Sequence, residues 1–487
     1  MRSRGLMFMG TGSDVGKSLI VAGLCRLLSN RGLAVRPFKP QNMSNNAAVT
    51  ADGGEIGRAQ ALQARAARVP ASVHMNPILL KPESGTGAQI IVQGQREATL
   101  SARQFFAERP RYMPAILDSF RRLASQAEFI LVEGAGSPGE INLRQGDLAN
   151  MGFAEAANLP AILVGDIERG GVIASIIGTL QILDQTDRNR IKGFIINKFR
   201  GDPELFSEAR IFFEKKTATP CFGVVPFLSE AAKLPAEDTV ALEAQTVNHS
   251  AKIRISVLRL PRIANFDDLD PLRLEPSVNL SFVGPGEAIP GDTDLVVIPG
   301  SKSTVGDLAT LRAEGWDVDL AAHVRRGGHV IGLCGGYQML GRMIHDRAGL
   351  EGTPGSVAGL GYLDVETELL PDKTLTEVSA RHVTTGLPLK GYEIHLGETH
   401  GPDCDRPFAQ IGAKPDGAMS RNGLIAGTYL HGCFASDGFR RAFLAGLGAT
   451  GSDLNYEGAV EDALDTLARH LEAHLDIDRL LAQATPL

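Results

Sequence analysis

The sequence has few cysteines, no long apolar run and no excess of positive charge. Its five cysteines are scattered over 487 residues without a CxxC pair, which argues against a disulfide framework or a zinc-finger pattern. No run approaches the roughly 20 apolar residues of a membrane span, and residues 6–9 are too short for a secretory signal. A net charge of −7 disfavours a general nucleic-acid surface. We therefore expect a cytoplasmic protein without membrane or nucleic-acid partners.

The length and composition predict a globular chain of more than one domain. Apolar residues make up 43% and charged residues 22% of the sequence, and 487 residues exceed what a single core usually holds. The sequence becomes polar and loop-like over residues 235–252. We therefore expect domains at 1–245 and 250–445. Residues 446–487, with apolar positions at helical spacing, form a predicted helical extension.

A glycine-rich loop near the N-terminus has the features of a phosphate-binding loop. Residues 10–18 read GTGSDVGKS between an apolar strand at 5–9 and a helical pattern at 19–31. Backbone N–H groups of such a loop converge on phosphate, while Lys17 and Ser18 are placed for terminal phosphates and Mg²⁺. Thr11 replaces the glycine of the strict pattern. The loop is thus a variant, and its alternative interpretation is a purely structural turn.

Polar side chains end three later strands. The strand at 129–133 ends in Glu133, a second at 161–164 precedes Asp166, and a third at 193–196 precedes Asn197. The spacing predicts a parallel sheet covered by helices on both faces, whose strand ends face the nucleotide. Glu133 is thus a candidate Mg²⁺ ligand and Asn197 a candidate contact to the base. The alternatives are a solvated strand end and a turn residue.

Four runs make this half resemble a known family. FKPQNMSNN (38–46), VEGAGSP (132–138), DIERGG (166–171) and INKFRG (196–201) are similar to the dethiobiotin synthetase-like P-loop family, in its cobyric acid synthase branch. The resemblance implies ATP and Mg²⁺, with no tightly bound organic cofactor. It implies Mg²⁺ on Ser18, Glu133 and an acid within 52–55. We favour Glu55 over Asp52 because Glu55 opens a helix-like run at 55–68. The implied ATP-binding residues are Thr11, Gly12, Asp14, Val15, Gly16, Lys17, Ser18, Lys39 and Asn197.

A second glycine-rich run is typical of a nucleophile elbow. A strand at 328–333 leads into Cys334, with glycines on both sides in GLCGGYQ (332–338). Small neighbours permit the strained turn that exposes a nucleophile. Backbone N–H groups of Gly335 and of the loop at Gly300 are candidates for the oxyanion hole. The alternative is a buried, inert cysteine.

Two histidines are candidate bases for this thiol: His395 in GYEIHLG (391–397) and His431 in GTYLHGCF (427–434). The order Cys334 then His431 makes 252–440 resemble class I glutamine amidotransferases of the cobyrinate-amidating branch. That superfamily usually has Glu two residues after the histidine, where this chain has Cys433. We interpret Cys433 as a residue that packs in the core and not as the nucleophile. The site is then a dyad or uses another group, with Glu393 and His395 as conceivable helpers.

Together the resemblances imply an α/β protein with an N-terminal P-loop domain and a C-terminal flavodoxin-like amidotransferase domain. They imply that glutamine supplies ammonia, and that ATP activates carboxylates of a corrinoid, adenosylcobyrinic acid a,c-diamide, at its b, d, e and g side chains. One alternative is an amidase of another polycarboxylate, such as the earlier a,c step. Another is a P-loop switch ATPase with an inactive second domain. The oligomeric state is left open.

Overall fold

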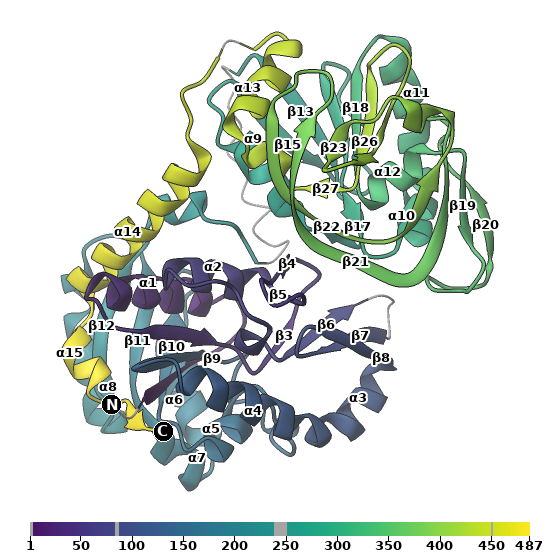
Figure 1. Ribbon diagram of the computed structural model, residues 1–487. Coiled ribbons are helices and arrows are strands. Elements are labelled where there is room, and N and C mark those ends of the chain that lie inside the picture. The colour runs from purple at the N-terminus through teal and green to yellow at the C-terminus, as the bar shows by residue number, and fades with distance from the viewer. Residues whose placement is uncertain (1–2, 83–86, 238–250, 450) are drawn as a thin grey trace. The chain divides into compact units, whose positions relative to one another are not determined.

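The computed structural model describes residues 3–82, 87–237, 251–449 and 451–487, which form two compact units (Figure 1). The first comprises Met1–Ser44, Thr50–Pro235 and Val460–Leu487, and the second comprises Asn45–Val49 and Ala236–Ala459. The predicted boundary at 245–250 lies outside the described residues. The last 28 residues of the extension expected at 446–487 belong to the first unit.

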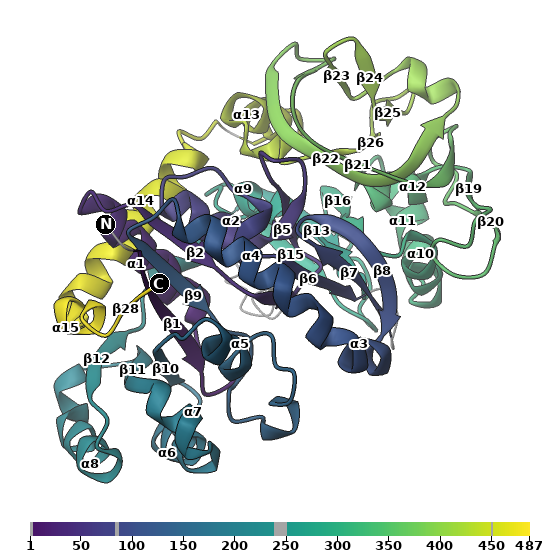
Figure 2. The same ribbon diagram turned by 60° about the horizontal axis from the view of Figure 1, so that its bottom comes forward.

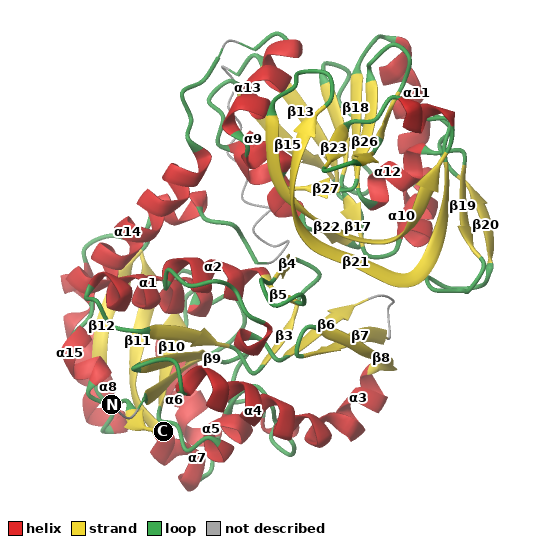
Figure 3. Ribbon diagram, viewed as in Figure 1, coloured by secondary structure: helices red, strands yellow, loops and turns green. Residues whose placement is uncertain are grey.

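A parallel sheet forms the centre of the first unit, with helices on both faces (Figure 3). The strand order is β12-β11-β10-β1-β9-β2, and β1 is fully buried from Leu6 to Met9. Strands buried on both faces are continuous apolar runs, which is why these segments were recognisable in the sequence. The strands are β1 (Arg4–Gly10), β2 (Val35–Phe38), β9 (Phe129–Glu133), β10 (Ala161–Asp166), β11 (Ile191–Phe199) and β12 (Cys221–Pro226).

Helices cover both faces of this sheet, and the two whose ranges the sequence predicted begin at other residues than expected. Helix α1 (Lys17–Asn30) begins two residues earlier than predicted, after Gly16 in the left-handed conformation. The helix-like run expected at 55–68 is wrong at its start, because β5 (Glu55–Gly57) precedes α2 (Arg58–Ala66). Gly57 has an extended backbone and packs against Asn42, whose side chain a Cβ would meet at 2.2 Å. The remaining larger helices are α4 (Met113–Ala124), α5 (Met151–Ala156), α6 (Val172–Ile182), α7 (Gln185–Arg190) and α8 (Ser207–Thr217).

A second, small sheet of the first unit was not predicted. Its order is β3-β6-β7-β8, and only β3 and β6 are parallel. The strands are β3 (Gln41–Met43), β6 (Ile78–Pro82), β7 (Gly87–Val92) and β8 (Gln95–Ser101). A capping box between Ser101 and Gln104 starts α3 (Ala102–Glu108) directly after β8.

The C-terminal segment completes the first unit. Helix α14 (Tyr456–His474) packs its Leu467 and Leu471 on Gly23 of α1, where a Cβ would lie 2.5 Å from Leu471. Arg26, almost completely buried, forms ion pairs with Glu461 and, at 2.7 Å, with Asp465. Helix α15 (Ile477–Leu481) follows, and β28 (Thr485–Pro486) pairs with β1. The predicted helical C-terminus is confirmed.

The second unit combines a mostly parallel sheet with an antiparallel one. The first of these has the order β15-β13-β16-β18-β26-β25, and Trp316 is buried among the side chains that pack on it. Its strands are β13 (Ile253–Leu258), β15 (Val278–Val283), β16 (Leu295–Ile298), β18 (His329–Leu333), β25 (Ala418–Met419) and β26 (Ile425–Thr428). The helices of this unit include α9 (Asp270–Arg273), α10 (Thr304–Ala313), α11 (Trp316–Arg325), α12 (Gly335–Leu340) and α13 (Asp437–Gly446).

The antiparallel sheet is dominated by two long strands, β21 (Glu366–His382) and β22 (Pro388–His400), which curve together in Figure 2. Its order is β20-β19-β21-β22-β27. In addition, β23 pairs with β21, and β24 pairs with β23. The short strands are β19 (Met343–Asp346), β20 (Gly355–Ala358), β23 (Ala409–Ile411), β24 (Lys414–Asp416) and β27 (Leu430–His431). Within the described ranges, no helix has both the length and the apolarity needed to cross a membrane.

Candidate active sites

The glycine-rich loop of the first unit has the shape of a phosphate cradle. The Lys17 ammonium donates to the carbonyl oxygens of Gly12 at 3.1 Å and Gly136 at 3.2 Å, so it lies over the loop. A Cβ at Gly10 would lie 2.5 Å from the Gly12 carbonyl oxygen, and this main-chain contact explains why glycine is required there. Gly16 directly precedes α1, so the N-terminal end of this helix faces the loop.

Glu133 is the hub of the polar groups beside this loop. Its carboxylate, buried at the end of β9, accepts from the Ser18 hydroxyl at 2.8 Å and from the Lys39 ammonium at 2.9 Å. A hydroxyl and a carboxylate in contact are suitable oxygen ligands for Mg²⁺, which usually takes one or two protein groups plus phosphate oxygens. The donor set therefore fits the implied metal. Among the described residues, no cluster of three or more His, Cys, Asp or Glu side chains forms an all-protein metal cage.

Two glutamines at this centre were missed by sequence reasoning. Gln63 donates to the second carboxylate oxygen of Glu133, and Gln60 approaches the same oxygen at 3.5 Å. Both lie on α2 with no exposed surface. Their spacing of three residues places them on one helix face. Two amide side chains on a buried helix face are the sequence signal that could have identified them.

The two acids weighed for the metal lie in different surroundings. Glu55 is buried and pairs with Lys81 at 2.6 Å. Asp52 is exposed and accepts from the Ser72 hydroxyl at 2.7 Å and the Val73 N–H at 3.1 Å. Partial burial opposes ionisation of Asp52, but these hydrogen bonds prevail and lower its pKa. Asp52 thus braces a turn, and Glu55 stays the favoured candidate.

The end of β11 supports the loop from another side. The Asn197 amide donates to the Val15 carbonyl at 2.9 Å, and the Lys198 ammonium donates to the Asp14 carbonyl at 2.6 Å and to Asp166 at 2.9 Å. These bonds fix the loop backbone. The role of Asn197 at the base stays a prediction, and Lys198 is an addition that the sequence did not suggest.

Cys334 of the second unit occupies a strained turn between β18 and α12. Its φ of 50° and ψ of −108° are a conformation that costs roughly 1–3 kcal/mol for a non-glycine residue. A Cβ on Gly336 would lie 2.0 Å from the Ile298 carbonyl oxygen, so glycine is obligatory at this crossing. The thiol donates to the Ile394 carbonyl oxygen at 3.5 Å. The geometry is that of a nucleophile elbow.

The predicted oxyanion loop lies against this elbow. A Cβ on Gly335 would be 3.0 Å from the Ser301 backbone nitrogen, so the two chain segments are in contact. Pairing of β14 (Ile263–Ala264) with β17 (Gly300–Ser301) fixes the loop. A Cβ on Gly300 would be 3.3 Å from the His431 ring. The residues named from the sequence therefore lie together, and their role toward an oxyanion stays a prediction.

Asp268 takes the place left by the missing glutamate. Its carboxylate accepts from His431 Nδ1 at 2.6 Å and from the Gly432 N–H at 2.6 Å. Burial opposes charge on the imidazole, but the Asp268 charge and hydrogen bond, together with the Cys334 thiol, raise the pKa of His431 to about 10. Asp268 lies on η7 (Phe266–Leu269), 163 residues before His431. The run DDLD (267–270) offered no spacing that would single it out.

The side chains named as conceivable helpers have other partners. Glu393 lies 3.7 Å from His395 Nε2, and His395 stacks on Tyr429 with ring centroids 3.8 Å apart. The hydrogen bond and charge of His395 lower the pKa of Glu393 despite its burial. Cys433 is completely buried, and burial raises the pKa of its thiol. Asp268 is therefore the carboxylate that orients His431.

Gln338, three residues into α12, connects the elbow to a chain of hydroxyl groups. Its amide accepts from the Thr304 hydroxyl at 2.9 Å and donates to the Tyr429 hydroxyl at 3.1 Å. The Tyr429 hydroxyl lies 2.6 Å from the Thr399 hydroxyl, and the Thr399 hydroxyl lies 2.7 Å from that of Thr367. These bonds hold the helix that follows the nucleophile.

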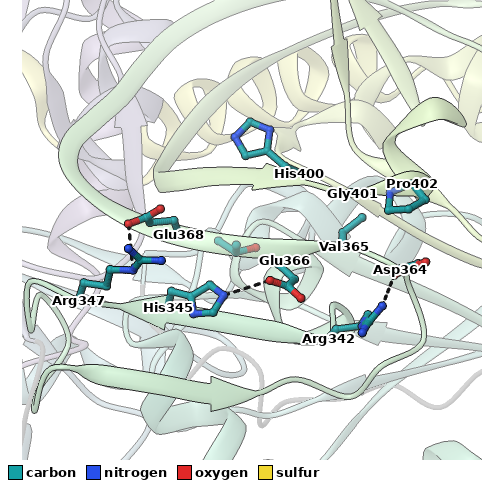
Figure 4. Close-up of a pocket in the computed structure, with 11 residues that line it drawn as sticks. Arg342, His345, Arg347, Asp364, Val365, Glu366, Glu368, His400, Gly401 and Pro402 are labelled. Carbon is teal, nitrogen blue, oxygen red and sulfur yellow. Dashed lines mark hydrogen bonds and ion pairs between the residues drawn. The ribbon is translucent and has the colours of Figure 1, made fainter.

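Thr367 also lines a charged pocket of about 460 Å³ in the second unit (Figure 4). Side chains on and beside β19 pair with acidic residues at or just before the start of β21. Arg342 pairs with Asp364 at 2.8 Å, His345 with Glu366 at 3.2 Å and Arg347 with Glu368 at 3.5 Å. The dashed lines in Figure 4 mark these pairs.

The comparisons with known proteins agree with the two-domain architecture. Residues 6–241 match the CobQ/CobB/MinD/ParA nucleotide binding domain, and residues 254–439 match the CobB/CobQ-like glutamine amidotransferase domain. A protein named cobyric acid synthase from Cereibacter sphaeroides is 59% identical over 98% of this chain and 99% of its own. A second, from Paracoccus denitrificans, is 60% identical over the same shares, and a third, from Bradyrhizobium diazoefficiens, is 58% identical over 99% and 100%. The chain belongs to the cobyric acid synthase family of glutamine-dependent amidotransferase ligases.

Proposed function

We propose that this enzyme amidates the b, d, e and g carboxylates of adenosylcobyrinic acid a,c-diamide, with ATP as activating substrate and glutamine as nitrogen donor. One observation carries the proposal. The chain holds a Cys334–His431–Asp268 constellation in one unit and a phosphate cradle beside Glu133 in the other. The family membership supplies the corrinoid. Because both units belong to one chain, the same polypeptide carries both half-reactions.

The geometry of the second unit supports a mechanism for glutamine hydrolysis. His431 accepts the thiol proton of Cys334, and the thiolate attacks the amide carbon. N–H groups of Gly335 and of the Gly300 loop stabilise the tetrahedral oxyanion. His431 then gives its proton to the leaving nitrogen, and ammonia departs as the thioester forms. Water, deprotonated by His431, cleaves the thioester to glutamate and restores the thiol. Asp268 keeps the imidazole in the tautomer that accepts at Nε2 throughout.

Carboxylate activation is the task of the first unit. Lys17 and Lys39 hold phosphate oxygens, and Ser18, Glu133 and Glu55 are the candidate Mg²⁺ ligands. Bound Mg²⁺ would neutralise phosphate charge. The substrate carboxylate attacks the γ-phosphorus of ATP, and ADP leaves. Ammonia then attacks the acyl phosphate carbon, the C–O bond breaks and phosphate departs with the electron pair, so that an amide remains. A closed site protects the acyl phosphate from water.

The decisive experiment is mass spectrometry of the corrinoid after incubation with enzyme, ATP, Mg²⁺ and glutamine. Successive conversion of the b, d, e and g carboxylates to amides supports the proposal. No change in the a,c-diamide, with amidation of cobyrinic acid itself, would instead assign the earlier a,c step. ATP hydrolysis that is independent of any carboxylate, without glutamine turnover, would identify a P-loop switch ATPase. The contact of Asp268 with His431 favours an active glutaminase over that last alternative.

A further inference from the structure

Strand β22 passes beside both members of the thiol site. Tyr392 is the register partner of His431 across the β22–β27 pair, and the two rings are stacked with centroids 5.1 Å apart and planes 12° apart. Gly391 makes this approach possible, because a Cβ there would lie 1.9 Å from the His431 carbonyl oxygen. Part of the GYEIHLG motif thus serves to place an aromatic ring on the face of the imidazole.

Tyr392 is itself anchored by the segment that carries Asp268. The Asn265 amide donates to the Tyr392 hydroxyl at 3.0 Å. Asn265 has φ 53° and starts η7, the turn that presents Asp268 to His431 Nδ1. One short segment therefore fixes the edge of the imidazole through a carboxylate and its face through a tyrosine.

The same strand touches the nucleophile two residues further along. The Ile394 carbonyl oxygen accepts from the Cys334 thiol at 3.5 Å, and residues i and i+2 of a strand are on the same side. Asp268 and Cys334 are the ionisable groups that act on His431. The thiol must give up its proton to the imidazole in the proposed hydrolysis, so groups that stabilise the imidazolium favour that step.

We propose that Tyr392 is a positioning residue for glutamine hydrolysis, whose ring holds the His431 imidazole toward Cys334 and stabilises the imidazolium formed by proton transfer. The electron-rich face of an aromatic ring attracts a cation, so the stack favours the state in which the S–H bond has broken and the Nε2–H bond has formed. Asp268 acts in the plane of the imidazole and Tyr392 on its face. This inference rests on the proposed glutaminase function.

The test compares three variants of the full-length enzyme. Tyr392→Leu removes the ring, Tyr392→Phe keeps the ring but loses the Asn265 bond, and Tyr362→Leu removes a partly buried tyrosine elsewhere in the unit as a control. We expect Tyr392→Leu to lower glutamine-dependent kcat about tenfold with little change in KM. Tyr392→Phe and Tyr362→Leu stay close to wild type. Amidation from free ammonia should be unchanged in all three, and thermal unfolding of each variant checks that its second unit is folded.

Alkylation of Cys334 by iodoacetamide, followed by peptide mass spectrometry across pH, gives a readout that does not depend on turnover. Without the ring the imidazolium is less stable, so thiolate formation moves to higher pH in Tyr392→Leu and not in Tyr392→Phe. An unmoved profile in Tyr392→Leu overturns the inference. An equal loss of glutamine-dependent kcat in Tyr392→Phe also overturns it, because that result would assign the effect to the hydroxyl and not to the ring. Should Tyr392→Leu unfold, Tyr392→Met carries the test. A wild type that turns over no glutamine refutes the proposed function, whereas alkylation still decides this inference.

Discussion

Replacing Asp268 by asparagine isolates the group that the sequence did not reveal. Asp268 accepts two hydrogen bonds, from His431 Nδ1 and from the Gly432 N–H. Asparagine has one acceptor and one donor. If its oxygen serves Gly432, its amide nitrogen faces Nδ1 and forces the imidazole proton onto Nε2. That tautomer cannot accept the thiol proton from Cys334, although the fold is unchanged.

The magnitude follows from the charge that is lost. Burial disfavours a charged His431, and Asp268 is the main group that raises its pKa to about 10 from an ordinary value of 6.5. At about 1.4 kcal/mol per pKa unit, the difference corresponds to about 5 kcal/mol in favour of the imidazolium. A misplaced tautomer in a comparable triad costs about 10⁴ in kcat. We therefore expect Asp268→Asn to lower glutamine-dependent kcat by about 10³–10⁴.

The assay measures glutamate released from glutamine and, separately, amide formed from free ammonia. Asp268→Asn should lose the first activity and keep the second, because the ATP-dependent unit is untouched. Asp267→Asn is the matched control, since it changes the adjacent carboxylate on the same turn, and should behave as wild type. If Asp268→Asn keeps more than a tenth of wild-type glutaminase activity, His431 does not depend on this carboxylate and the reasoning is refuted.

Three further predictions concern both units. Cys334→Ser should abolish amidation from glutamine and leave amidation from ammonia, whereas Lys17→Ala should lose both in the same amide-formation assay. Gly336→Ala would press a methyl group to within 2.0 Å of a main-chain carbonyl, and should lower the free energy of unfolding by about 3 kcal/mol in denaturant titrations. Because the pKa of His431 is raised on folding, its stabilisation is complete below about pH 6.5 and is lost as pH rises through about 10. Denaturant titrations should show that decline in wild type and a smaller one in Asp268→Asn.

The parts of the sites that sequence motifs encode were predictable. Lys17 and Ser18 follow a buried strand, Glu133 ends another and Cys334 follows a third. In a parallel sheet the carboxyl ends of strands share one edge, so recognising the strands was enough to bring Lys17, Ser18 and Glu133 together. The glycines beside Cys334 are demanded by close main-chain approach, which leaves a local trace in the sequence.

Asp268 and Tyr392 left no such trace. Each reaches its partner across a long loop closure, and only the packing of whole elements decides which of several acids or rings arrives. Asp267 and Asp270 were as plausible as Asp268 in the sequence. Glu55 was assigned to a helix because helical spacing continued through it, whereas the structure places it in the short strand β5.

Because residues 460–487 belong to the first unit, this unit can complete its fold only at the end of protein synthesis. Arg26 is buried on α1 but its carboxylate partners, Glu461 and Asp465, emerge from the ribosome more than 430 residues later. A nascent chain ending near residue 235 therefore exposes the groove of α1 that α14 will cover, with the Arg26 guanidinium still without its carboxylate partners. The nucleotide-binding unit matures only after the amidotransferase unit has been translated, so the cell does not produce a finished ATP-consuming half before the half that supplies its ammonia exists.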